Sequence, residues 1–348
     1  MLDQPDMIAR YDKSDALGVI TGLPNQLSHD FLVPEGLAEM RGISSIVLTG
    51  MGGSAQGAEF VKTWLSDRLS VPLVIVRDYA LPAFVGPDTL VIAASYSGNT
   101  EETLTAIKDA SAKKARIVVI AAGGKLLETA KTMDYPYFVL PGGLQPRFAV
   151  LYAVRALVTV IETLGLVSGV LDELAAAGKW LDGQLGAWAP DVPTTDNAAK
   201  RIAESLVGHV AVVYAGPTLA FAAMKWKIAF NENSKNIAFY NYFPEMDHNE
   251  FIGWQFPKAS GIKVIELRSD LDSTQEIDRF DITNRLLSAS FAPIEVHAVG
   301  DTKLRQLVWT IGLGEHVACY LAFLNGIDPT PVLLVEKLKT ELAQHRLR

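Results

Sequence analysis

Short apolar runs, separated by segments with helical spacing, recur along the whole chain. Each run is four to eight residues long and apolar throughout rather than alternating, which is typical of strands buried on both faces of a parallel sheet. We therefore predict an α/β protein with two parallel sheets, each flanked by helices on both faces. The predicted strands are 45–50, 73–77, 90–95, 117–121, 137–140, 209–216, 263–267 and 294–299.

The helical patterns fall between these strands and at the end of the chain. They cover residues 58–65, 101–114, 217–233, 304–324 and 331–344. The apolar stretch 148–171 contains Arg155 and Glu162, so it is predicted to be a buried helix rather than a membrane span. An irregular stretch over 178–196 contains Pro190 and Pro193. The predicted organisation is a first domain over 1–165, a helical or irregular linker over 166–198 and a second domain over 199–348.

Composition narrows the class of protein. A length of 348 residues suggests two domains of roughly 100–200 residues each. The net charge is −8 and there is no long run of lysine or arginine, so we expect neither a nucleic-acid surface nor a membrane surface. The single cysteine, Cys319, excludes an intramolecular disulfide and is expected in the core. Residues 1–10 lack the apolar segment of a signal peptide, which favours a cytoplasmic protein.

Two loops in the first half are candidates for a phosphate site. In open parallel sheets, ligands bind outside the carboxyl ends of the strands, which directs attention to the loops after Gly50, Ser95 and Gly216. The first two loops each open a helix, whose free N–H groups attract anions. The predicted phosphate-binding residues are Gly53, Ser54, Ser95, Ser97 and Thr100, which supply backbone and hydroxyl donors.

A simpler interpretation exists for each loop alone. A glycine loop after a strand is often only a turn, and Ser97 or Thr100 could be a helix N-cap with Glu101 and Glu102 in the first turn. Because two such loops occur at the carboxyl ends of strands in the same half of the chain, we favour a phosphate site over a simple turn or helix cap. The first loop has neither the G-x-G-x-x-G spacing of a dinucleotide site nor the lysine of a P-loop.

These loops resemble those of the sugar isomerase (SIS) family, and further segments resemble the bifunctional phosphoglucose/phosphomannose isomerases. The resemblance covers nearly the whole chain, so the two domains are expected to be SIS domains. Its most specific parts are the serine-rich loop 95–103 and the segment Pro244-Glu245-Met246-Asp247-His248-Asn249-Glu250. Pro146-Arg147, Asn231-Glu232-Asn233-Ser234-Lys235-Asn236, Asp328-Pro329-Thr330-Pro331-Val332 and Leu338-Lys339 complete it.

The resemblance implies an enzyme that interconverts glucose 6-phosphate, and mannose 6-phosphate as well, with fructose 6-phosphate through a cis-enediol. It implies that Glu232 is the base, that Arg147 stabilises the anionic intermediate and that His248 protonates the ring oxygen. In this family the histidine reaches the partner subunit's site, which implies a homodimer with its active site at the interface. Lys339 is the second ring-opening candidate, with Lys337 as the alternative.

No cofactor is implied, because proton transfer needs none. The chain has no H-E-x-x-H pattern or clustered His/Cys spacing, so no metal site is expected. Two rival functions compete with the isomerase. One is an SIS enzyme for an amino sugar phosphate or an arabinose phosphate, which often carries a glutaminase domain or CBS repeats. The other is a non-catalytic phosphosugar sensor, which usually carries a basic helix-turn-helix. Neither extra module is evident here.

Overall fold

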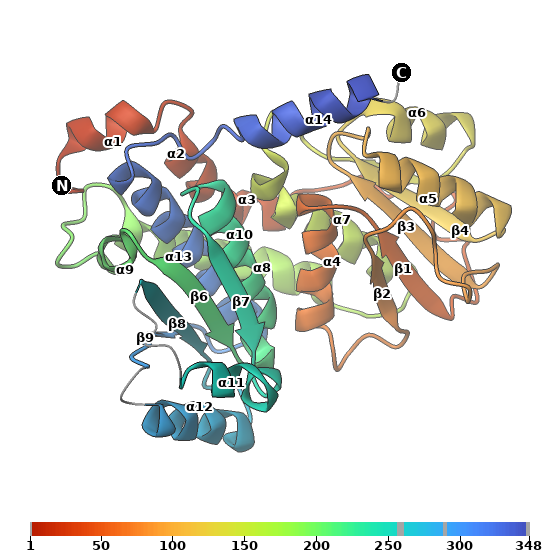
Figure 1. Ribbon diagram of the computed structural model, residues 1–348. Coiled ribbons are helices and arrows are strands. Elements are labelled where there is room, and N and C mark those ends of the chain that lie inside the picture. The colour runs from red at the N-terminus through yellow and green to blue at the C-terminus, as the bar shows by residue number, and fades with distance from the viewer. Residues whose placement is uncertain (1, 256–260, 288–290, 346–348) are drawn as a thin grey trace.

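Two separate parallel sheets form the framework of the protein. The computed structural model describes residues 2–255, 261–287 and 291–345 (Figure 1). One sheet has the order β2-β1-β3-β4-β5 and the other the order β7-β6-β8-β9, with every pair of neighbouring strands parallel. The predicted α/β class with two parallel sheets is therefore confirmed. The strands are β1 (Ser45–Thr49), β2 (Leu73–Val76), β3 (Thr89–Ser95), β4 (Arg116–Ala121), β5 (Tyr137–Val139), β6 (Val210–Ala215), β7 (Ala238–Tyr242), β8 (Ile262–Arg268) and β9 (Ile294–His297).

Helices cover both faces of each sheet. In the first half they are α1 (Pro5–Tyr11), α2 (Ala16–Thr21), α3 (Leu23–Leu27), α4 (Gly53–Trp64), α5 (Glu101–Ala112), α6 (Gly124–Thr132), α7 (Val150–Thr163) and α8 (Val170–Leu185). In the second half they are α9 (Ala198–Leu206), α10 (Ala220–Glu232), α11 (Glu250–Gly253), α12 (Thr274–Leu286), α13 (Lys303–Leu324) and α14 (Leu333–His345). Within the described residues, four short 3-10 turns complete the list: η1 (Pro146–Phe148), η2 (Gly186–Trp188), η3 (Pro217–Leu219) and η4 (Glu245–His248).

The strands are apolar throughout because both of their faces are packed. In β1, Val47 lies in a core cluster with residues of α5 and α6, whereas its neighbour Leu48 lies in the cluster of α4 and α7. Successive side chains of a strand point to opposite faces, so both faces need apolar residues. The cluster that contains Leu48 continues through α10 and α13 to Val213 on β6. Helices α4 and α7, on the first sheet, thus meet α10 and α13, which lie beside the second sheet, in the space between the two sheets (Figure 1).

Three expectations about local structure were wrong or incomplete. The stretch 148–171 was expected to be a buried helix, but α7 ends at Thr163 and α8 begins only at Val170. The stretch 178–196 was expected to be irregular, but α8 continues to Leu185. Gly178 belongs to this helix because a β-carbon there would lie 2.7 Å from the carbonyl oxygen of Pro24, so its absence lets α3 pack closely on α8. Strand β7 was not predicted. It is a five-residue edge strand, and its aromatic residues are largely exposed, so it lacks the continuous apolar pattern of the other strands.

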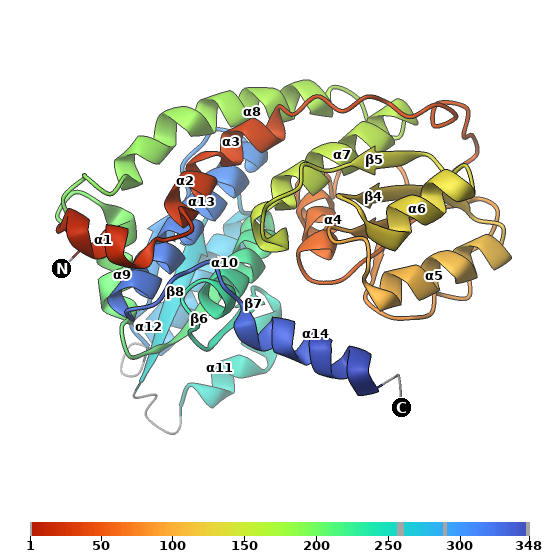
Figure 2. The ribbon, with the colours of Figure 1, turned by 90° about the horizontal axis from the view of Figure 1, so that it is seen from above.

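Helix α13 forms the centre of the second half and also binds the N-terminal segment. Within the described residues it is the one helix long and apolar enough to cross a membrane, yet 89% of its most apolar window is buried in the protein. Cys319, on α13, is fully buried, as expected of a core residue. Helices α1 and α2 pack against α13, so the start of the chain contacts the second half. By contrast, α14 projects from the body of the protein (Figure 2).

Candidate active site

The two serine- and glycine-containing loops lie side by side because they follow neighbouring strands. Strands β1 and β3 are paired in parallel, so the loops after Thr49 and Ser95 leave the sheet at the same edge. The Ser54 hydroxyl accepts a hydrogen bond from the backbone N–H of Tyr96 at 2.9 Å, which joins the two loops directly. The structure therefore brings the predicted phosphate-binding residues together where β1 and β3 lead into α4 and α5.

The second loop is held in shape by its own hydroxyl groups. The Ser95 and Thr100 hydroxyl oxygens are 2.8 Å apart, and the Gly98 N–H donates to the Ser95 hydroxyl at 3.1 Å. Ser95 is buried and Ser97 is exposed. Gly98 has φ +67°, and a β-carbon there would overlap the carbonyl oxygen of Gly123, so the loop requires glycine at this position. Exposed hydroxyl and backbone donors at the start of α5 can bind an anion.

The first loop rests directly on the segment that carries Arg147. A β-carbon at Gly53 would lie 2.7 Å from the carbonyl oxygen of Pro146 and 3.1 Å from the nitrogen of Arg147. Glycine is therefore required for this close approach. Tyr96 reinforces the arrangement, since its hydroxyl donates to the carbonyl of Pro141 at 2.8 Å and accepts from the N–H of Leu144 at 3.0 Å. The two candidate loops and Arg147 thus form one packed unit.

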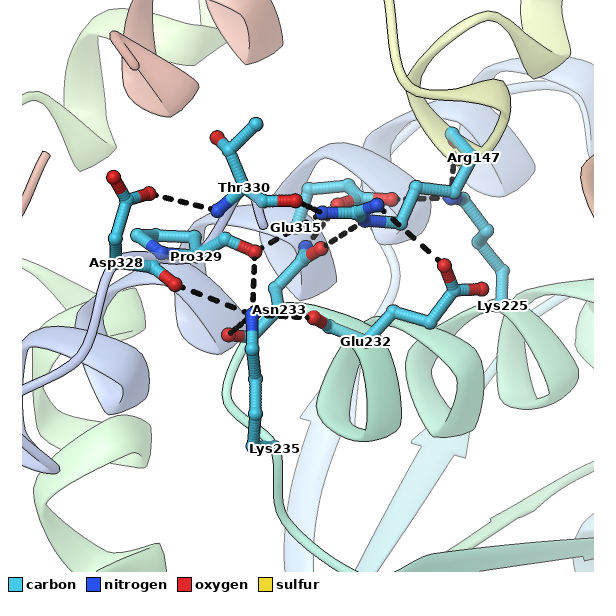
Figure 3. Close-up of polar contacts among 9 residues, drawn as sticks. All are labelled: Arg147, Lys225, Glu232, Asn233, Lys235, Glu315, Asp328, Pro329 and Thr330. Carbon is cyan, nitrogen blue, oxygen red and sulfur yellow. Dashed lines mark hydrogen bonds and ion pairs between the residues drawn. The ribbon is translucent and has the colours of Figure 1, made fainter. Parts of the chain in front are cut away.

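Arg147 occupies the centre of a polar network between the two halves (Figure 3). Its side chain is 1% exposed. Its Nε donates to Asn233 Oδ1 at 2.6 Å, and one Nη donates to the carbonyls of Pro329 and Thr330 at 3.0 and 2.8 Å. The other Nη lies 3.5 Å from Glu232 Oε2. Burial lowers the pKa of Arg147, an effect opposed by the charges of Glu232 and Glu315; a guanidinium stays protonated all the same.

Glu232 is the last residue of α10 and faces Arg147 from the edge of the network. Its side chain is 35% exposed, so the carboxylate lies at the boundary between the buried arginine and solvent. A carboxylate beside a fixed cation, open on one side, can exchange a proton with a bound molecule. The contacts that connect the candidate loops to Glu232, through Gly53 and Arg147, lie within one chain.

A second charged pair, formed by Lys225 and Glu315, holds both Arg147 and Asn233 in place. Lys225 Nζ lies 2.5 Å from Glu315 Oε1, and the two side chains are only 4% and 2% exposed. The Lys225 ammonium also donates to the carbonyl of Arg147 at 2.8 Å. Glu315 accepts from Asn233 Nδ2 at 2.9 Å. Asn233 is thereby oriented so that its oxygen faces Arg147, and the pair fixes the arginine at both its backbone and its side chain (Figure 3).

Sequence reasoning did not name Lys225 or Glu315 as site residues. A usable signal existed, because each is a charged residue flanked by apolar residues within a largely apolar helix. A charge in such a position must find a partner when the helix is buried. The partner could not be identified without the fold, since the two residues lie on different helices, far apart along the chain.

His248 does not meet Glu232 within one chain. It is an exposed residue of η4, which follows the carboxyl end of β7. Glu232 ends α10 just before β7 begins, so the two lie at opposite edges of this sheet, on the order of 15 Å apart by strand length. Asp247 holds η4 in place by accepting from Arg279 Nη1 and the Thr283 hydroxyl, both at 3.0 Å.

The two candidate lysines lie on α14, where both are exposed. The structure brings neither Lys337 nor Lys339 into contact with the Arg147 network, and the choice between them stays open. They project from different sides of the helix. Among the described residues, no group of three or more His, Cys, Asp or Glu side chains is arranged to hold a metal ion.

The third candidate loop, after Gly216, is not part of this site. A β-carbon at Gly216 would lie 2.2 Å from a carboxylate oxygen of Asp272, and the N–H of Thr218 donates to that carboxylate at 3.1 Å. The helix start of the second sheet is therefore already capped by the chain's own carboxylate. Burial raises the pKa of Asp272.

Comparison with known proteins identifies the class first. The model of the SIS domain matches residues 39–128, and that of the bacterial phospho-glucose isomerase C-terminal SIS domain matches residues 195–342. A hypothetical protein from Thermus thermophilus shares the fold, with a TM-score of 0.72 at 17% identity over 99% of this chain and 94% of that one. The chain is thus an SIS-fold protein of two α/β halves.

The particular family follows from closer relatives. The bifunctional phosphoglucose/phosphomannose isomerase of Caldicellulosiruptor bescii is 36% identical, over 93% of this chain and 98% of that protein. The protein of the same name from Aquifex aeolicus is 35% identical, over 94% and 98% respectively. The chain belongs to the bifunctional phosphoglucose/phosphomannose isomerase family and is a sugar-phosphate isomerase. The predicted resemblance is confirmed.

Proposed function

We propose that this isomerase interconverts both glucose 6-phosphate and mannose 6-phosphate with fructose 6-phosphate through a cis-enediol. The observation that supports this most is the packed unit of phosphate loops, Arg147 and Glu232, in which Gly53 touches the Pro146–Arg147 backbone and Arg147 lies 3.5 Å from the Glu232 carboxylate. A sugar phosphate held by its phosphate group at the loops would extend along this unit towards the carboxylate.

The chemistry assigns one role to each group. Glu232 removes the C2 proton of the open-chain aldose and returns it to C1, while the oxygen at C1 gains a proton and that at C2 loses one, so that no atom is gained or lost. The buried guanidinium of Arg147 stabilises the negative charge of the enediolate, and it needs no reorganisation because Asn233 and two carbonyls already hold it. The two aldoses differ only in configuration at C2 and give the same enediol, so the proposal requires a rotation about C2–C3 that presents either C2 proton to Glu232.

The proposal includes a homodimer in which His248 of the partner subunit opens the sugar ring. Within one chain, His248 and Glu232 lie at opposite ends of β7 in the second sheet. Exposed apolar side chains support a second subunit. Leu334, Leu338 and Leu342 form a stripe along α14, and they are 82%, 58% and 48% exposed. A long leucine stripe facing water is a common mark of an interface.

The direct test offers fructose 6-phosphate to the purified protein and monitors both aldose products. We expect both to form. Glu232→Gln keeps the shape of the side chain but removes the base, so kcat should fall by about 100- to 10,000-fold. Glu204→Gln, near the end of α9, is the matched control and should retain full activity. An active Glu232→Gln enzyme would remove the assignment of the base.

Mixing two inactive variants tests the shared site. Glu232→Gln and His248→Ala would be co-refolded or allowed to exchange subunits. If His248 serves the partner subunit, each mixed dimer contains one intact site, and random exchange restores about a quarter of wild-type activity. If His248 serves its own subunit, no intact site forms and no activity returns. Separate alanine variants of Lys337 and Lys339 would decide which lysine is needed.

A further inference from the structure

Lys235 adopts a backbone conformation that ordinarily belongs to glycine or asparagine. It follows the end of α10 with φ +56°, and the next residue's N–H, at Asn236, donates back to the carbonyl of Phe230 at 3.0 Å. This is the helix-ending pattern in which the left-handed position is usually glycine. A lysine with a β-carbon in this conformation costs free energy relative to glycine, which directs attention to the contacts that its side chain makes.

The lysine ammonium joins the end of α10 to a segment far along the chain. Its Nζ lies 2.8 and 3.2 Å from the carbonyl oxygens of Glu232 and Asn233, at the end of the helix. It also lies 2.8 and 3.2 Å from the carbonyl oxygens of Pro329 and Asp328 (Figure 3). Cations are favoured at helix carboxyl ends, but here the same cation also binds a second backbone segment.

That second segment is held from the opposite side by Arg147. The Pro329 carbonyl accepts from both Lys235 Nζ and an Nη of Arg147, and the Thr330 carbonyl accepts from the same Nη. The Asp328 carboxylate closes the turn by accepting from the N–H of Thr330 at 2.9 Å. The turn over 328–330 is therefore held between two cations, one of which belongs to the active-site network.

This turn sets the direction of α14. The helix begins at Leu333, three residues after Thr330, and the described side chains along it are exposed. Its path therefore depends on the turn before it rather than on packing along its own length. Burial, together with the nearby charge of Arg147, lowers the pKa of Lys235 to about 8, as expected for two cations that share one carbonyl group.

We propose that Lys235 is a positioning residue, whose ammonium clasps the 328–330 turn against Arg147 and so sets the place of α14 and its lysines relative to Glu232. This rests on the proposed isomerase function. The clasp itself, however, can be observed without any activity. Lys235 does not need to touch the substrate for this role.

The test replaces Lys235 with glycine, which suits the left-handed conformation and removes only the ammonium. The matched control is Lys114→Gly, since Lys114 also has a left-handed backbone, with φ +58°, just beyond the end of α5. Two quantities are measured: hydrogen exchange at the Thr330 amide, and kcat and KM for fructose 6-phosphate. Lys235→Arg, which keeps a cation with several donors, serves as the rescue variant, and circular dichroism confirms folding.

We expect Lys235→Gly to speed exchange at Thr330 by about tenfold or more and to lower kcat by about 100-fold, the loss that a misplacement of about 1 Å can cause. KM should change little, because the phosphate loops are untouched. Lys235→Arg should recover part of both, and Lys114→Gly should change neither. Unchanged exchange at Thr330 overturns the clasp, and faster exchange with unchanged kcat overturns the positioning role. A wild-type protein without isomerase activity overturns the proposed function, while the exchange result still decides the clasp.

Discussion

Removing the ammonium of Lys225 tests whether the buried pair with Glu315 holds the Arg147 network in place. Lys225→Met keeps the volume of the side chain but leaves the Glu315 carboxylate, 2% exposed, with the Asn233 amide as its remaining donor. It also deprives the Arg147 carbonyl of the Lys225 donor. Breaking a buried ion pair on one side typically costs about 3–5 kcal/mol, because the other charge stays buried without compensation.

The assay is urea denaturation at fixed protein concentration, followed by steady-state kinetics. We expect Lys225→Met to lower the free energy of unfolding by about 3–5 kcal/mol and Lys225→Met/Glu315→Gln to regain most of it, since the second change removes the stranded charge. The kcat of the single variant should also fall. Without Lys225, Glu315 is no longer fixed in the position from which it orients Asn233 towards Arg147.

Lys200→Met separates a loss of stability from a loss of function. Lys200 is also fully buried, and its ammonium donates to the carbonyls of Pro190 and Val192, both at 2.8 Å, and to Asp3. These contacts lie away from the Arg147 network. We expect this variant to lose stability but to keep its kcat below the unfolding transition. A cost below about 1 kcal/mol for Lys225→Met, or a double variant no more stable than the single one, would refute the reasoning about the pair.

Two further predictions concern the candidate loop that contains Gly53 and a buried carboxyl group. Gly53→Ala places a β-carbon 2.7 Å from the Pro146 carbonyl oxygen, so we expect it to lower the free energy of unfolding by about 1–3 kcal/mol and to lower kcat. The control is Gly183→Ala, in open space on α8, which should stabilise the protein by about 1 kcal/mol. Equal effects of the two variants in urea denaturation would contradict the packing argument. Burial raises the pKa of Glu266 from 4.5 to about 7, so between these pH values the folded protein holds a proton on Glu266 that the unfolded chain has lost. The free energy of unfolding should therefore fall as pH rises from 4.5 to about 7, by about 3 kcal/mol relative to Glu266→Gln. The difference between the two unfolding free energies at about pH 5 and about pH 8 measures this, and a pH-independent difference would contradict it.

The positions of most strands and of the two glycine- and serine-containing loops followed from local pattern. A strand buried on both faces needs an apolar residue at every position, and a loop that contacts backbone needs glycine, so both leave marks within a few residues. Strand β7 was not predicted from the sequence, because an edge strand with exposed faces does not need an apolar residue at every position. The stretch 178–196 misled because Gly178 is typical of a helix breaker, although here it permits α3 to pack against α8.

By itself, then, the sequence determined the α/β class and the two parallel sheets, because these depend on local patterns of apolar residues. It also determined the family, because the similarity to relatives extends over most of the chain. Tertiary structure alone decided that Lys225 pairs with Glu315, that Asp272 fills the loop after Gly216, and that Lys235 binds the 328–330 turn. Each of these contacts joins a charged group to a partner that is distant in the sequence. The identity of such a partner depends on which helices and turns the fold brings together, and on burial that makes an unpaired charge too costly to leave.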